Sequence, residues 1–370
     1  MVGDLSNPDA ASPPGRPLLL PVASGKGGVG KSFLAANLAI AFAARGRRTI
    51  VCDLDFGGSS LHRFLGLPNR HPGLSDFLCG HAGNLEDLAI ETPWERLRFL
   101  PGDGWTPLLA NLPGAKKAKL MRHLARLAAD VVVLDLGAGS SLTTLDVFGM
   151  TEAGLLVSTP DAAALGGMLV FLKNDLHRRI EKRLSAWKNP ALSRLLKAER
   201  EKPLASQAAS LEEFAARLAA AFPPVAAAIR SLSESLRPRV VLNRALRDEE
   251  IEVAYAVEQA LRVKLGVTPE FYGFIREDPA VAEALRRGRA FLADNPAGPV
   301  AEALHRLAGR IDRYWERRVP DTADRLARRL IRIPAKPPAG APGGEPFGAQ
   351  PGGAHLPRAS LLRRLSRAAR

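Results

Sequence analysis

The sequence predicts an α/β fold, a doubly wound and mostly parallel sheet with helices on both faces. A glycine-rich stretch at residues 25–32 stands between an apolar run at 18–23 and a run of helix formers at 33–42. Four consecutive apolar residues, mostly β-branched, occupy 131–134, which is typical of a strand buried on both faces. Further apolar runs at 155–157 and 240–242 alternate with helical patterns, and this alternation favours parallel strands.

The stretch at 25–32, GKGGVGKS, fits the phosphate-binding pattern G-x-x-x-x-G-K-[ST]. Its glycines let backbone N–H groups turn toward a polyphosphate, and the following helix N-terminus adds partial positive charge. Lys31 is expected to contact the β- and γ-phosphates, and the Ser32 hydroxyl to bind Mg²⁺. The predicted nucleotide-binding residues of this loop are Gly25, Lys26, Gly27, Gly28, Val29, Gly30, Lys31 and Ser32.

A second lysine inside the loop, Lys26, gives the form known as a deviant Walker A motif. With it the sequence resembles the MinD/ParA family of ATPases, and most closely the branch of MinD and its flagellar relative FlhG. The resemblance implies that Lys26 reaches across a homodimer interface to the partner's ATP, as an arginine finger does.

Two carboxylates follow predicted strands. Asp55 comes after the strand at 47–53, and Asp135 ends the strand at 131–134. Carboxyl ends of parallel strands face the ligand crevice. The resemblance implies that Asp55 orients the attacking water or contacts Mg²⁺ through water, with Asp53 in support, and that Asp135 holds Mg²⁺. Lys26, Lys31, Asp55 and Asp135 are the predicted catalytic residues, and Ser32, Asp55 and Asp135 the predicted Mg²⁺ ligands.

A later strand at 239–242 leads into Asn243 and Arg244. The resemblance assigns this asparagine to the adenine edge, where its amide offers both a donor and an acceptor. Arg244 is included in the predicted nucleotide site.

The chain is predicted to comprise a disordered segment at 1–17, a P-loop ATPase domain at 18–333, a Pro/Gly-rich linker at 334–357 and a basic amphipathic helix at 358–370. Within the domain we expect a helical insertion at about 188–236. Within 70–120, the stretch around 99–105 is expected to be a strand followed by a long loop. The final helix is expected over 299–314, with an extension to 333.

The C-terminal segment carries a disproportionate share of the charge. Residues 321–370 hold nine Arg and one Lys against two Asp and one Glu, a net +7 out of +14 for the chain. In a helix, Leu361, Leu362 and Leu365 would share one face and Arg363 and Arg364 the other. This pattern is typical of a reversible membrane anchor for an anionic surface, as in MinD proteins. A basic tail that binds DNA or RNA, and a tail with no binding role, are the alternatives.

Two cysteines, Cys52 and Cys79, have no metal-ligand spacing and are expected to be buried, reduced thiols. They also lack the late C-x-x-C pattern that the resemblance would require of an iron–sulfur carrier. There is no run of 18 apolar residues and no signal-peptide pattern in residues 1–17. The expected location is therefore cytoplasmic, peripheral on the inner face of the cell membrane.

Together these features predict an ATP-dependent dimerising switch ATPase with ATP and Mg²⁺ as cofactors. It would cycle on and off the inner membrane to position a division, polar or flagellar assembly, and an unidentified protein would stimulate hydrolysis. The alternatives are a ParA-like partition ATPase that binds non-specific DNA and a nucleotide-binding scaffold with negligible hydrolysis.

Overall fold

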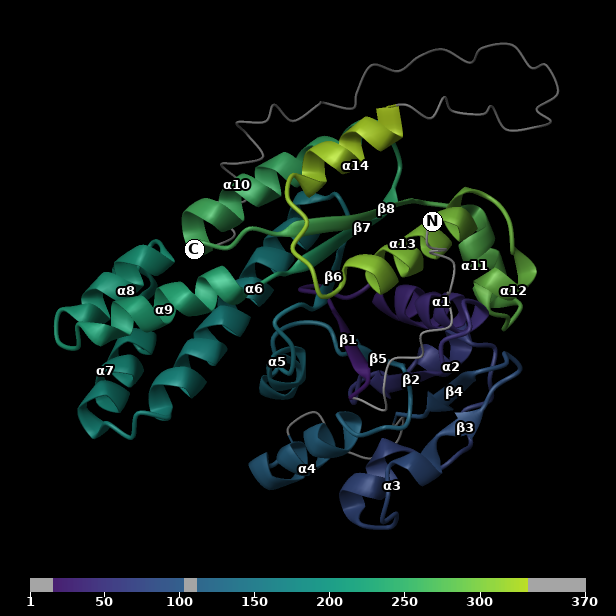
Figure 1. The fold of residues 1–370 in the computed structure, drawn as a ribbon, viewed down its shortest axis with the longest axis horizontal. Coiled ribbons are helices and arrows are strands. Elements are labelled where there is room, and N and C mark those ends of the chain that lie inside the picture. Colours follow the sequence, from purple (N-terminus) through teal and green to yellow (C-terminus); the bar gives the residue numbers. More distant parts are fainter. Residues whose placement is uncertain (1–15, 103–111, 332–370) are drawn as a thin grey trace, which may run out of the picture.

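The computed structural model describes residues 16–102 and 112–331, with one eight-stranded sheet in the order β3-β4-β2-β5-β1-β6-β7-β8 (Figure 1). β3 pairs antiparallel with β4, and the other neighbours pair in parallel. The strands are β1 (Leu18–Ala23), β2 (Thr49–Leu54), β3 (Ile90–Glu91), β4 (Leu97–Leu100), β5 (Val131–Leu136), β6 (Leu155–Ser158), β7 (Arg239–Ala245) and β8 (Glu270–Arg276).

Helices cover both faces of this sheet, and the predicted doubly wound α/β fold is confirmed. The first half of the chain contains α1 (Lys31–Ala44), α2 (Leu61–Phe64), α3 (Leu74–Cys79), η1 (Glu86–Leu88), α4 (Gly114–Leu124), α5 (Leu142–Phe148) and α6 (Ala162–Ser185). The second half contains α7 (Pro190–Arg200), η2 (Leu204–Ser206), α8 (Leu211–Ala219), α9 (Pro224–Ser235), η3 (Asp248–Glu252), α10 (Val253–Leu265), α11 (Pro279–Arg286), α12 (Phe291–Asp294), α13 (Pro299–Tyr314) and α14 (Thr322–Ile331).

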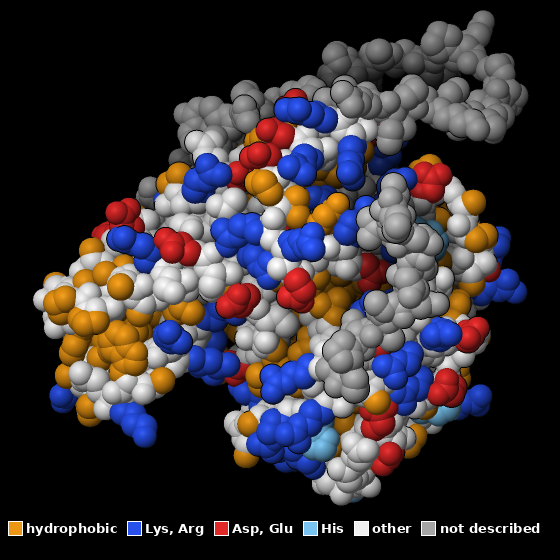
Figure 2. Space-filling view, in the orientation of Figure 1, with side chains coloured by type: hydrophobic (Ala, Val, Ile, Leu, Met, Phe, Trp, Pro, Cys, Tyr) orange, Lys and Arg blue, Asp and Glu red, His pale blue; other side chains and the backbone are white. Residues whose placement is uncertain are grey.

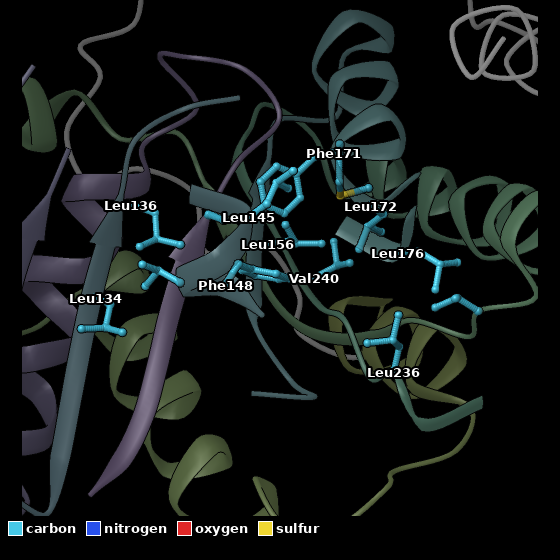
Figure 3. Packing of buried hydrophobic residues seen from close by; sticks show 14 of the residues in the cluster. Leu134, Leu136, Leu145, Phe148, Leu156, Phe171, Leu172, Leu176, Leu236 and Val240 are labelled. Atoms are coloured by element: carbon cyan, nitrogen blue, oxygen red, sulfur yellow. The ribbon is translucent and has the colours of Figure 1, made fainter. Parts of the chain in front are cut away.

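Alternation along the central strands produces two hydrophobic cores, one on each face. In β5, Val131 and Val133 join the core beneath α1 and α13, whereas Val132 and Leu134 join the core beneath α6 and α10. All six residues of β5 are buried, because successive side chains point to opposite faces of the sheet and helices cover both faces. Figure 3 shows the second core, where Leu156 of β6 lies near Phe171 and Leu172 of α6, and Leu134 and Leu136 of β5 belong to the same core farther along the sheet.

The strand order places the phosphate-binding loop where the winding direction changes. β1 lies between β5 and β6, so that the chain leaves β1 toward β2 on one side and later returns to β6 on the other. In such sheets the crevice beyond the carboxyl ends of the strands receives the ligand. The loop after β1, Asp55 after β2 and Asp135 at the end of β5 therefore share one edge.

Three helices within residues 188–236, α7, α8 and α9, form a lobe at one side of the sheet (Figure 1). Asn189 caps α7 by accepting hydrogen bonds from two backbone N–H groups, at 3.0 and 3.1 Å. Ser210 caps α8 by accepting a hydrogen bond from Glu213 N at 3.2 Å, and the Glu213 side chain accepts one from Ala209 N, just before the cap, at 2.7 Å. Leu211, Phe214 and Leu218 then face the core beneath α6.

Two sequence predictions about elements were wrong. The final helix does not continue from 299–314 toward 333, because a turn with Pro320 and a left-handed Asp321 (φ 51°) separates α13 from a distinct α14. The region after β4 is not simply a long loop, because α4 forms at Gly114–Leu124, where Leu120 and Leu124 enter the core. The predicted segments at 1–17 and 334–370 lie outside the described residues, apart from 16 and 17.

Candidate functional site

The loop at 25–32 depends on glycine at particular positions. Gly28 and Gly30 have φ of 79° and 90°, in the left-handed region that favours glycine. Gly25 lies against the backbone of α6, where a Cβ would meet the carbonyl carbon and oxygen of Gly167 at 2.0 Å. Ser24, just before the loop, donates its hydroxyl to Lys26 O at 2.9 Å and accepts Gly139 N at its own carbonyl at 2.9 Å. The loop is thus joined to α6 and to the segment after β5.

Lys31, Asp55 and Asp135 lie together at the start of α1. Lys31 Nζ lies 3.3 Å from Asp135 Oδ1 and 3.9 Å from Asp55 Oδ2. The lysine and Asp135 are buried, whereas the Asp55 side chain is one-quarter exposed. Gly137, after β5, lies beside Asp55, since a Cβ there would be 3.2 Å from Asp55 Oδ1. The segments at the carboxyl ends of β2 and β5 therefore lie together beside the amino group of Lys31.

Asp135 has the character of a cation ligand. Its Oδ2 atom is buried and has no hydrogen-bond partner among the described residues. Burial raises the pKa of Asp135 to about 7, against the opposing effects of Lys31 and of a hydrogen bond from Ser32. A free carboxylate oxygen beside a serine hydroxyl is a hard-oxygen set that Mg²⁺ favours when phosphate oxygens complete its coordination. The residues present therefore fit the predicted metal.

Asp53 holds the backbone that carries Asp55. It is fully buried and accepts hydrogen bonds from Ser59 Oγ at 2.7 Å, Leu61 N at 3.0 Å and Asp55 N at 3.2 Å. Burial raises the pKa of Asp53, partly offset by these hydrogen bonds. Its oxygens are occupied by this segment, so its role in the structure is support.

Asn243 and Arg244 contact the phosphate-binding loop from β7. Asn243 is buried and donates its amide nitrogen to Val29 O at 2.9 Å. Arg244 has a left-handed backbone (φ 57°), and its guanidinium donates to Gly28 O at 3.0 Å and to Glu277 at 3.0 Å. Both residues thus lie at the predicted site, while the adenine contact stays a prediction.

Lys26 is exposed, as expected of a residue that acts outside its own protomer. Against the effect of burial, hydrogen bonds from Thr159 and from the first turn of α6 lower the pKa of Asp161, and the charge of Lys26 adds a smaller effect in the same direction. Asp161, Ser24 and Gly167 were not predicted as site residues. The Gly166-Gly167 pair inside a helical run was the available signal for a close backbone approach.

Cys52 is buried, and burial raises the pKa of its thiol. The expectation that Cys79 is also buried was wrong, because this residue is the last of the short helix α3 and is exposed. Among the described residues no group of three or more His, Cys, Asp or Glu side chains could hold a metal.

Comparison with known proteins agrees with this geometry. The ParA family model, described as "NUBPL iron-transfer P-loop NTPase", matches residues 18–95. The flagellum site-determining protein YlxH of Helicobacter pylori is 31% identical over 153 residues, 41% of this chain and 51% of that protein. The iron–sulfur cluster carrier protein of Escherichia coli is 34% identical over 167 residues, 43% of this chain and 44% of that protein. The chain spans about half the length of these curated relatives.

Among solved structures, the septum site-determining protein MinD of Pyrococcus horikoshii, in complex with Mg-ADP, superposes with a TM-score of 0.54. The match covers 80% of this chain and 96% of that one at 22% identity. This likeness shows a common fold. Residues 18–95 match the ParA family model, and the relatives and structural neighbours of the chain include MinD proteins.

Proposed function

We propose that this protein is a Mg²⁺-dependent ATPase that dimerises when it binds ATP. The observation that carries the proposal is the convergence of Lys31, Asp135 and Asp55 at the end of the phosphate-binding loop. Lys31 supplies positive charge to the transferring phosphoryl group, and Asp55 orients the attacking water. Ser32 and Asp135 would hold Mg²⁺, which neutralises charge on phosphate oxygens when bound.

The exposed Lys26 supports the dimer in this proposal. Lys31 is the cation that pairs with Asp55 and Asp135 among the described residues, and phosphoryl transfer commonly uses an additional one. A Lys26 from a second copy would supply it, so hydrolysis would depend on dimerisation. The relatives named for septum and flagellum placement support a role in positioning such an assembly.

We further propose that the dimer attaches to the inner face of the cell membrane through residues 358–370 and that a stimulating protein ends attachment. No helix in the described part of the chain has the length and hydropathy needed to span a bilayer. One basic amphipathic tail binds weakly, but two tails on one dimer gain affinity through effective concentration. ATP would in this way control attachment.

A second candidate is a partition ATPase that binds non-specific DNA. Figure 2 shows Lys and Arg side chains gathered over α4, which carries Lys116, Lys117, Lys119 and Arg122. Such a basic surface supports binding to a phosphate backbone. An iron–sulfur carrier role finds less support, because the chain has two cysteines, one of them buried in the sheet.

The test is co-sedimentation of the full chain and of residues 1–355 with anionic vesicles, in ADP and in ATP. We expect the full chain to pellet in ATP only, and the shorter chain to remain in the supernatant. If neither pellets while both bind duplex DNA, the partition function replaces the membrane function. If both forms pellet equally in ADP and ATP, the proposed control by nucleotide is contradicted.

A further inference from the structure

A groove of about 880 Å³ lies between α5 and α6 on one side and α7, α8 and α10 on the other. Buried apolar side chains line it, among them Leu145, Leu169, Phe214 and Leu265. Residues 25–32 do not line it, so it is separate from the phosphate-binding loop. α7 and α8 belong to the lobe, and the groove exists because the lobe stands beside α6.

Exposed apolar residues continue the lining outward. The Leu142 side chain is 59% exposed and Val170 is 38% exposed, and both border the groove. They are two of only six large hydrophobic residues exposed in the described part of the chain. A hollow with exposed apolar side chains at its border is a feature of protein interaction sites.

The charge of the lining is unbalanced. It contains four cations, Lys173, Arg178, Arg200 and Lys264, and two anions, Glu181 and Glu199. Both glutamates are already paired, Glu181 with Arg200 at 3.2 Å and Glu199 with Lys202 and Arg217. Lys173 and Lys264 have no carboxylate within 4 Å among the described residues, and Lys264 makes only a long contact of 3.4 Å to Ala209 O. The groove therefore favours an occupant with negative charge.

Polar groups also interrupt the apolar lining. Asn174, His177 and Gln207 border the groove between the leucines. A continuous hydrocarbon chain would leave these groups without partners, whereas a peptide helix presents polar and apolar side chains side by side. The basic segment at 358–370 of this chain would bring arginines against Lys173 and Lys264, and like charges placed together oppose binding.

We propose that this groove is the docking site for an amphipathic helix of a partner protein, with its leucine-type face against Leu142, Val170 and Phe214 and acidic residues against Lys173 and Lys264. Leu142 is the first residue of α5, and the segment between Asp135 and α5 is joined to the phosphate-binding loop through the Gly139–Ser24 hydrogen bond. The partner thus contacts a helix next to the nucleotide site. This docking surface goes beyond the proposed function and does not depend on it, since binding can be measured without nucleotide.

The experiment uses two labelled synthetic helical peptides with the same leucine face, one with glutamates and one with lysines on its flanks. We expect the full chain to bind the glutamate peptide at least about tenfold more tightly, by fluorescence anisotropy. The double variant Lys173→Glu and Lys264→Glu should reverse this preference. A reversal requires folded protein, so unfolding cannot produce it. Leu142→Ala should weaken binding of both peptides several-fold.

Matched controls are Lys197→Glu on α7 and Val263→Ala on α10, which replace exposed side chains that do not line the groove. They should bind like the unmodified chain. Equal binding of the two peptides, or a preference that the double variant leaves unchanged, would overturn the proposal. Displacement of the glutamate peptide by a peptide of residues 356–370 would instead assign the groove to this chain's own segment.

Discussion

The phosphate-binding edge of the sheet and the α7–α9 lobe are stabilised in opposite ways. At the edge, buried charges are left incompletely paired: Asp135 has a free oxygen, and burial raises the pKa of both Asp53 and Asp135. In the lobe, helix ends are capped by Asn189 and Ser210, and Glu199 has two cationic partners. Unsatisfied buried charge costs stability and persists where a ligand completes it. The edge therefore depends on a ligand to complete its charges, whereas the helices of the lobe are stabilised by contacts within the chain.

The largest effect should come from a substitution at the phosphate-binding edge of the sheet. Lys31→Ala removes the amino group that, in the described part of the chain, lies within 4 Å of both Asp55 and Asp135. We expect ATP hydrolysis to fall by about 10²–10³-fold, because one preorganised charge is lost from the transition state. The rate of hydrolysis is measured as phosphate release. Lys173→Ala in the groove is the control, which should keep the activity of the unmodified chain. Comparable hydrolysis in Lys31→Ala would contradict the site.

The next largest effect should come from a substitution at the contact between the phosphate-binding loop and α6. Gly25→Ala places a methyl group where the backbone of Gly167 lies, and the two segments must move apart. We expect a loss of about 1–3 kcal/mol in the free energy of unfolding and weaker nucleotide binding. Gly27→Ala is the control, since nothing lies within 4 Å of its added Cβ. Denaturant unfolding of both variants checks the prediction, which fails if the two are equally stable.

The phosphate-binding site shows which of its features the sequence could predict and which it could not. The octapeptide and Asp135 were predictable because their chemistry is encoded in short, contiguous patterns. The contact of Gly25 with Gly167, and that of Asn243 with Val29, join residues more than a hundred positions apart. No local periodicity records such a contact. The break between α13 and α14 was missed although Pro320 signalled it, because the apolar pattern continues on both sides.

Acid should reduce the stability of the protein between pH 7 and pH 5 through one buried histidine beside the lobe. Burial lowers the pKa of His177, which packs against Phe214 of α8, to about 4. The folded protein disfavours the protonated imidazole. The free energy of unfolding is therefore highest at pH above about 6.5 and decreases as the pH falls toward 4. His177→Phe should therefore reduce the loss of stability between pH 7 and pH 5 by about 1–2 kcal/mol. Thermal unfolding at the two pH values measures it, and an unchanged difference would contradict the assignment.

The smallest effect should be confined to the lobe. Ser210→Ala removes the hydroxyl that accepts Glu213 N at 3.2 Å at the start of α8. We expect a loss of about 1 kcal/mol in stability, with ATP hydrolysis unchanged. Ser210→Asn should retain most of the cap. A large drop in hydrolysis would show that the lobe and the edge are more strongly coupled than their separate stabilisation implies.

The most direct test of the nucleotide switch is the oligomeric state of the full chain in ADP and in ATP, by sedimentation velocity. The Asp55→Ala variant is included to slow hydrolysis, and Lys26→Ala to remove the exposed cation. We expect monomer in ADP, dimer in ATP for Asp55→Ala, and monomer in both nucleotides for Lys26→Ala, which should still bind ATP. An ATP-bound monomer in Asp55→Ala, or an equally stable dimer without Lys26, would contradict the dimer proposal.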